Sequence, residues 1–110
     1  MSNRAFLDMT PHEFVQKRES GELWQLLDVR EPWEIEIASV EDSLTIPMAE
    51  MPRRIAELDL QAPIAVLCHG GFRSASVAAW LSENGADRVA NISGGIDAWA
   101  MTVDRTLSRY

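Results

Sequence analysis

The chain of 110 residues carries a formal net charge of −7; 46% of its residues are hydrophobic and 25% are charged. This balance is typical of a globular protein, and we expect a single domain over residues 1–110. The acidic charge, with no cluster of lysines or arginines, disfavours a nucleic-acid surface. One cysteine excludes an internal disulfide and, with only two histidines, disfavours a bound metal.

The sequence also bears on where the protein is found. No stretch approaches the ~18 apolar residues of a membrane span, so we expect no membrane contact. The first residues, MSNRAFLDMTPHEF, lack the long apolar segment of a signal peptide. A lone cysteine fits a compartment that keeps thiols reduced. We therefore predict a cytoplasmic protein.

The first predicted helix begins at a capping box. In this motif Thr10 is the N-cap, Pro11 is the first helical residue and Glu13 is the third. The helix should end near Ser20, because Gly21 follows as a stop signal.

Short apolar segments alternate with helical patterns along the rest of the chain. The apolar segments predict strands at 23–29, 44–47, 63–68 and 88–92. The helical patterns predict helices at 31–38, 48–58, 73–84 and 94–101. This alternation predicts an α/β fold, in which helices cover both faces of a parallel sheet.

Polar or reactive residues follow two of the predicted strands. Cys68 ends the most apolar strand, and Asp28 and Arg30 lie at the end of another. Because sites in open parallel sheets lie beyond the carboxyl ends of the strands, we expect these ends to share one surface.

The residues after Cys68 predict a nucleophilic thiolate. Gly70 and Gly71 allow the backbone to curl, which can turn N–H groups inward around an anion. A helix that begins near Arg73 or Ser74 adds unpaired N–H groups and the positive end of its dipole. These surroundings stabilise a thiolate. The competing interpretation is that Cys68 is only a small buried hydrophobic residue.

Four segments resemble the rhodanese family in order and spacing. CHGGFRS (68–74) resembles the family's active-site loop, commonly Cys-x-x-Gly-x-Arg-Ser. The others are LLDVREPWE (26–34), IPM (46–48) and NISGGIDAW (91–99). The resemblance runs from about Thr10 to Trp99 and implies a rhodanese-like fold, with a mostly parallel sheet of about five strands. One stretch departs from the family: ASVEDS (38–43) stands where Gly-His-Ile-Pro-Gly-Ala is usual, so that loop should differ in shape.

The resemblance implies sulfur transfer by double displacement, without a cofactor. Cys68 would take the outer sulfur of a small anionic donor such as thiosulfate and pass it to cyanide or a thiol acceptor. The substrate-binding residues would be those of the loop: His69, Gly70, Gly71, Phe72, Arg73 and Ser74.

Three other functions compete with this one. The chain could be a persulfide carrier that delivers sulfur to a partner protein. Phosphatases and arsenate reductases of this fold have a loop one residue longer than the Cys68–Arg73 loop, so their chemistry is disfavoured. The presence of Cys68 disfavours an inactive regulatory domain.

Several polar residues have two interpretations. His69 either orients a donor or is simply an exposed loop residue. Arg73 either steers an anionic donor, which we slightly favour, or pairs with a carboxylate such as Asp28 or Glu34. We expect Asp28, Arg30 and Glu34 to support the loop structurally, because charges at strand ends commonly pair.

The tryptophans and Ser74 are expected to have structural roles. Trp24, Trp33, Trp80 and Trp99 should pack in the core rather than form a ligand cage. Ser74 should be a residue of the helix N-terminus rather than a nucleophile, because no base is placed for it.

Overall fold

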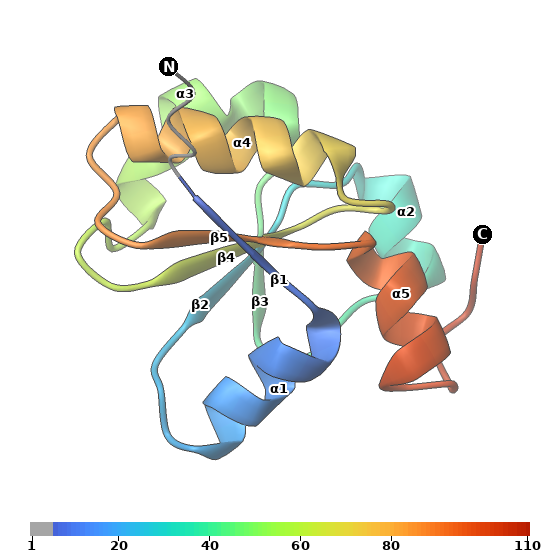
Figure 1. Cartoon of the computed structure of the whole chain (residues 1–110). Helices are drawn as coiled ribbons and strands as arrows, with labels where there is room; N and C mark the ends of the chain where they lie inside the picture. The colour runs from blue at the N-terminus through green and yellow to red at the C-terminus, as the bar shows by residue number, and fades with distance from the viewer. Residues whose placement is uncertain (1–5) are drawn as a thin grey trace.

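Five short strands form one sheet at the centre of the molecule (Figure 1). The computed structural model describes residues 6–110. The strands lie in the order β1-β5-β4-β2-β3, and every neighbouring pair is parallel. The α/β fold predicted from the sequence is therefore confirmed. The strands are β1 (Leu7–Met9), β2 (Gln25–Asp28), β3 (Ser43–Thr45), β4 (Ile64–Leu67) and β5 (Val89–Ile92).

Helices cover both faces of this sheet. In Figure 1, α3 and α4 lie above the sheet while α1 and α5 lie below it. Parallel strands need such crossover connections, and the helices bury both faces. The helices are α1 (Pro11–Glu19), α2 (Pro32–Ile37), α3 (Met51–Arg54), α4 (Phe72–Glu83) and α5 (Gly95–Thr102), with 3-10 turns at Met48–Glu50 and Ile55–Glu57.

The alternation of side chains along β4 divides the core into two clusters. Ile64 and Val66 pack in the cluster that includes Val77 and Leu81 of α4. The intervening Ala65 and Leu67 belong to the opposite cluster, with residues of α1 and α5. Because successive side chains of a strand point to opposite faces, one short apolar run supplies both halves of the core. In this second cluster the ring centroids of Phe14 and Trp99 lie 5.7 Å apart.

The capping box at the start of α1 is confirmed. The Thr10 side chain accepts a hydrogen bond from the Glu13 N–H, and the Glu13 carboxylate accepts one from the Thr10 N–H. These bonds satisfy N–H groups that a helix leaves unpaired at its start.

One strand was missed by the sequence analysis, and one expected helix is wrong. Strand β1 was not predicted, because its three residues include two exposed ones and show no apolar run. Its place comes instead from pairing with β5. The region 48–58 is not one helix: α3 has only four residues and lies between two 3-10 turns. Pro52 near its start cannot donate a backbone hydrogen bond, which limits a longer helix.

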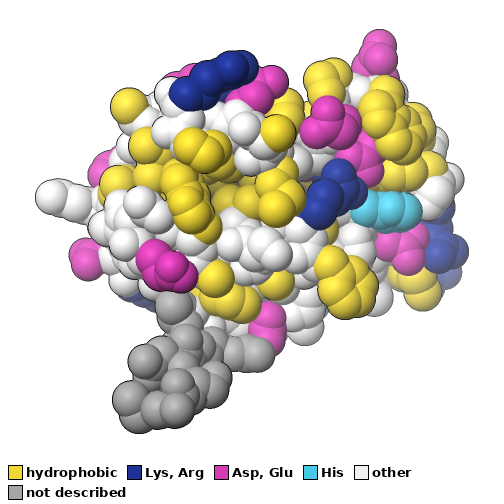
Figure 2. Space-filling model, turned by 90° about the horizontal axis from the view of Figure 1, so that it is seen from above, with side chains coloured by type: hydrophobic (Ala, Val, Ile, Leu, Met, Phe, Trp, Pro, Cys, Tyr) yellow, Lys and Arg dark blue, Asp and Glu magenta, His cyan; other side chains and the backbone are white. Residues whose placement is uncertain are grey.

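Of the tryptophans expected as core and packing residues, Trp24 and Trp99 are buried, whereas Trp33 is 59% exposed and lies outside the core, edge-on to the ring of Tyr110. Trp80 is partly buried at the surface of α4. Figure 2 shows this face, where hydrophobic side chains gather. Met48, Met51, Pro52, Ser76, Val77 and Trp80 line a groove of about 280 Å³ there.

The divergent loop at 38–43 is held by two arginines. The Arg18 guanidinium donates to the carbonyl oxygens of Glu41 and Asp42, and Asp42 has a positive φ of 59°. Arg30 donates to the Ala38 carbonyl at 2.8 Å. Among residues 6–110, no helix is long and apolar enough to cross a membrane.

Candidate active site

The carboxyl ends of β2 and β4 place the predicted site residues together. Asp28 is the register partner of Leu67, and the Val29 N–H donates to the Leu67 carbonyl at 3.0 Å. Cys68 follows Leu67 directly and is 1% exposed, in the core cluster on the α4 side of the sheet. The expected convergence of the two strand ends is therefore found.

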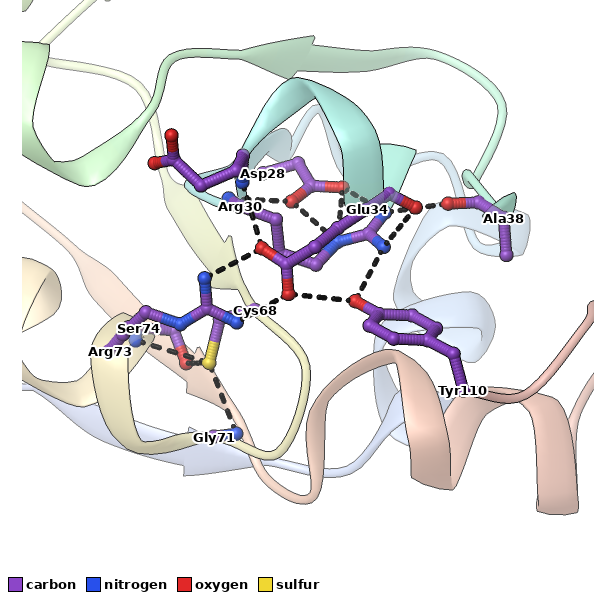
Figure 3. Close-up of polar contacts among 10 residues, drawn as sticks. Asp28, Arg30, Glu34, Ala38, Cys68, Gly71, Arg73, Ser74 and Tyr110 are labelled. Carbon is purple, nitrogen blue, oxygen red and sulfur yellow. Dashed lines mark hydrogen bonds and ion pairs between the residues drawn. The ribbon is translucent and has the colours of Figure 1, made fainter. Parts of the chain in front are cut away.

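The sulfur of Cys68 accepts hydrogen bonds from two backbone groups. The Gly71 N–H lies 3.1 Å from Sγ and the Ser74 N–H lies 3.3 Å from it (Figure 3). Gly71 has a φ of 104°, which a residue with a side chain rarely adopts, whereas Gly70 lacks a positive φ. Ser74 lies in the first turn of α4, where N–H groups have no partner within the helix. Both donors stabilise negative charge on the sulfur.

Three more N–H groups of the loop remain available. Within residues 6–110, the N–H groups of Gly70, Phe72 and Arg73 donate to no protein acceptor. A curled backbone with free N–H groups beside a helix N-terminus is suited to an anion. The Phe72 side chain is 86% exposed.

Asn91 of β5 fixes both residues that donate to the sulfur. Its Nδ2 donates to the Gly71 carbonyl at 3.2 Å and to Asp8 at 3.4 Å, which leaves Oδ1 facing Ser74. The Ser74 hydroxyl donates to this oxygen and also lies 3.2 Å from Sγ of Cys68. The sequence did not single out Asn91, because one asparagine in an apolar strand shows nothing about its contacts.

The start of α5 supports the loop from another side. The N–H groups of Ile96 and Asp97 donate to the carbonyls of Cys68 and His69 at 2.9 and 3.1 Å. Gly95 has a φ of 60°, and a Cβ at this position would overlap both carbonyl oxygens. Only glycine lets the two backbones approach this closely, which explains the second glycine of the pair in NISGGIDAW.

Arg73 makes a bidentate ion pair with Glu34. Its Nη1 and Nη2 lie 2.7 and 2.8 Å from Oε2 and Oε1. The Glu34 side chain is 4% exposed and also accepts the Glu31 N–H. The hydrogen bonds from Arg73 lower the pKa of Glu34 to about 2. Of the two carboxylates named in the alternative interpretation of Arg73, its partner is therefore Glu34 and not Asp28.

Asp28 pairs instead with Arg30, and both side chains are completely buried. The shortest contact between them is 2.7 Å, and Arg30 also donates to the Glu34 carbonyl at 3.2 Å. No buried side-chain nitrogen or oxygen in the described part of the chain lacks a partner. A buried pair with all its hydrogen bonds made fixes the loop after β2, which agrees with the structural role expected for these charges.

Tyr110, like Asn91, is a site residue that the sequence analysis missed. Its hydroxyl accepts from Arg30 at 2.9 Å and donates to Glu34 at 3.1 Å. Its ring stacks on the ring of His69, with centroids 4.1 Å apart. Because Tyr110 follows α5 in a segment without regular structure, no local pattern connects it with Cys68. His69 is thus in contact with a neighbour rather than free in solvent.

No metal centre accompanies this site in residues 6–110, which hold no cluster of three or more histidine, cysteine, aspartate or glutamate side chains suited to an ion. The donors to Cys68 Sγ are the backbone N–H groups of Gly71 and Ser74. These groups bind anions rather than cations.

Proteins with sulfur-transfer names are similar to this chain. A sulfurtransferase of Allochromatium vinosum is 39% identical over 75 residues, covering 68% of this chain and 70% of that protein. The thiosulfate sulfurtransferase GlpE of Pseudomonas aeruginosa is 32% identical over 94 residues, covering 86% and 84%. The putative sulfur carrier protein YrkF of Bacillus subtilis is 36% identical over 86 residues, covering 78% of this chain.

Some of these relatives are much longer than this chain. The chain spans 46% of YrkF. It spans 30% of the chloroplastic Rhodanese-like/PpiC domain-containing protein 12 of Arabidopsis thaliana, to which it is 41% identical over 90 residues.

A solved structure and a family model both match this chain over most of its length. The crystal structure of a rhodanese-like domain protein from Staphylococcus aureus superposes with a TM-score of 0.82 at 28% identity, covering 96% of this chain and 99% of that one. The model of the rhodanese-like domain matches residues 10–102. The chain therefore belongs to the rhodanese-like domain family.

Proposed function

We propose that the protein is a sulfurtransferase that carries a sulfane sulfur on Cys68. The observation that carries the proposal is the pair of backbone N–H groups, from Gly71 and Ser74, that donate to Sγ. They favour a thiolate as the attacking group and then offset the charge of a persulfide. The names of the Allochromatium and Pseudomonas relatives support the same chemistry.

The first step moves sulfur from a donor, which we propose to be thiosulfate. The Cys68 thiolate attacks the outer sulfur of thiosulfate and forms a new S–S bond. The S–S bond of thiosulfate breaks, and sulfite leaves with the electron pair. The free N–H groups of Gly70, Phe72 and Arg73 are suited to hold the anion during this step.

The second step returns the enzyme to its starting state. Cyanide, or an acceptor thiolate, attacks the terminal sulfur of the persulfide. A new bond forms to that sulfur, the persulfide S–S bond breaks, and the Cys68 thiolate leaves with its electron pair. With cyanide the product is thiocyanate. The site needs no acid or base for this exchange, because the leaving thiolate is stabilised by the Gly71 and Ser74 N–H groups.

The test is a thiosulfate:cyanide assay with the Cys68→Ser variant, combined with mass spectrometry of the intact protein. Serine keeps the volume of the side chain but removes the thiolate, so turnover should fall to background while the thermal melt stays cooperative. Ser76→Ala, an exposed change on the same helix, should keep activity within about twofold. Residual transfer above a few per cent of wild type in the serine variant would contradict the assignment of Cys68.

A second function, a persulfide carrier that serves a partner protein, is favoured by the name of the Bacillus relative. The same experiment separates the two. A carrier would gain the mass of one sulfur on Cys68 with negligible turnover to cyanide or small thiols, whereas an enzyme would turn over rapidly. A protein that neither gains sulfur nor turns over would contradict both functions.

A further inference from the structure

Tyr110 connects two charged side chains that lie beside the Cys68 loop, Arg30 and Glu34. Figure 3 shows its hydroxyl between Arg30 and Glu34. Arginine can only donate hydrogen bonds, so the Tyr110 oxygen must accept from Arg30 and its proton must point to Glu34. Burial raises the pKa of Tyr110 above its ordinary value, so the hydroxyl keeps the proton that it donates. The direction of this relay is therefore fixed.

The relay ends on the catalytic loop. Oε1 of Glu34 takes the Tyr110 hydroxyl and Nη2 of Arg73, while Oε2 takes Nη1 of Arg73 and the Glu31 N–H. Each oxygen of the carboxylate thus accepts two hydrogen bonds, and the carboxylate cannot rotate freely. Arg73 immediately precedes Ser74, whose N–H donates to Sγ. A carboxylate held in one plane therefore holds the first turn of α4 in register with the sulfur.

The ring of Tyr110 makes separate contacts. It stacks on His69 at 4.1 Å with an interplanar angle of 17°, and Trp33 meets it edge-on at 6.0 Å. His69 is the residue next to Cys68 in the loop. One side chain thus reaches the loop at both ends, through its ring at His69 and through Glu34 at Arg73.

We propose that Tyr110 is a positioning residue for the Cys68 loop, acting on Arg73 through Glu34 and on His69 through direct stacking. Tyr110 touches neither the sulfur nor, on this geometry, a substrate. It keeps the N–H groups around Cys68 aligned for attack on a sulfur donor. The kinetic part of this inference rests on the proposed function.

Tyr110→Phe tests the hydroxyl alone, because phenylalanine keeps the ring on His69 and Trp33. The change removes two hydrogen bonds, the one accepted from Arg30 and the one donated to Glu34, and should slow persulfide formation from thiosulfate about fivefold. Alkylation of Cys68 by iodoacetamide at neutral pH should slow about threefold for the same reason. Arg109→Ala, a change at the adjacent residue in a largely exposed pair with Asp97, should leave both rates within about twofold of wild type.

A double-mutant cycle shows whether Tyr110 acts through Glu34. In the Glu34→Gln background the bidentate hold on Arg73 is already lost, so Tyr110→Phe should slow either reaction less than about twofold further. A fivefold effect in both backgrounds would overturn the route through Glu34. Wild-type rates in Tyr110→Phe, with or without a lower melting temperature, would overturn the positioning role and leave Tyr110 a residue that only stabilises the fold.

The stacking contact has its own readout. In nuclear magnetic resonance spectra, the ring above His69 should shift the imidazole C–H signals upfield in the wild type and in Tyr110→Phe, but not in Tyr110→Leu. Equal shifts in all three proteins would overturn the stacking part. Neither the alkylation rate nor these chemical shifts depend on sulfur transfer, so both test Tyr110 even if the wild-type protein forms no persulfide.

Discussion

Replacing Glu34 by glutamine should lower the stability of the protein in a pH-dependent way. Glutamine keeps the shape of the side chain but removes the charge that pairs with Arg73. The pKa of Glu34 is lowered from 4.5 to about 2, chiefly by the hydrogen bonds from Arg73. A difference of this size corresponds to about 3 kcal/mol. Because the Arg73 side chain is 36% exposed, solvent screens the pair, and about 2 kcal/mol is the better expectation.

The sign follows from the lowered pKa. The folded protein holds Glu34 ionised at pH values where the unfolded chain already binds a proton. The stability contributed by the carboxylate is therefore complete above about pH 4.5 and is lost as the pH falls toward 2. The difference between wild type and Glu34→Gln should be full at pH 7, smaller at pH 4, about half or less at pH 3 and mostly gone near pH 2.

Urea unfolding of both proteins at a series of pH values measures this difference directly. At pH 7 the thermal midpoint of the variant should lie about 10 °C below that of wild type for a domain of this size. Glu13→Gln, an exposed change in the capping box of α1, is a control that should cost less than about 1 kcal/mol. A difference that stays constant from pH 7 to pH 3 would refute the argument, because it could not come from the charge on Glu34.

Two further substitutions test how the loop is held. Gly95→Ala should destabilise the protein by about 2 kcal/mol or more and slow sulfur transfer at least about tenfold, since its Cβ would displace the carbonyls of the Cys68 loop. Gly21→Ala, with a similar positive φ but open space around it, should cost only about 1 kcal/mol and leave the kinetics unchanged; matching losses in both variants would show that close approach is not the cause. Arg73→Lys should lose stability and activity together and show a flat salt profile, because lysine cannot make the bidentate contact to Glu34. Measuring kcat/KM for thiosulfate across a salt series would favour steering instead if lysine kept the activity and salt weakened it.

The sequence predicted those parts of the fold that have local causes. The apolar run before Cys68 and the glycines after it are properties of neighbouring residues, and both the strand and the start of α4 lie within one residue of the expected positions. Strand β1 has no such local signal, because its place depends on β5 from the far end of the chain. The pair between Arg73 and Glu34 was one of two options, and only the arrangement of the strands decides between them.

The roles of Asn91 and Tyr110 could not be predicted from the sequence, and the physical reason is the same for both. Asn91 is 20 residues from Gly71 and Tyr110 is 76 residues from Glu34, so neither contact leaves a periodic pattern. Both side chains act by completing hydrogen bonds that other elements have left open. Such a role depends on geometry rather than on residue type, since an asparagine or tyrosine elsewhere would be unremarkable.

The Cys68 loop is thus held from three directions, and each support acts on a different part of it. Strand β5 fixes the donors at Gly71 and Ser74 through Asn91, and α5 binds the carbonyls of Cys68 and His69. Glu34 of α2 holds Arg73. A loop presents N–H groups to an anion only if its backbone is held in place. A free backbone would rotate until those N–H groups found acceptors within the protein. The supports take up the carbonyls and side chains of the loop, so the remaining N–H groups stay directed at the sulfur and at whatever anion approaches it.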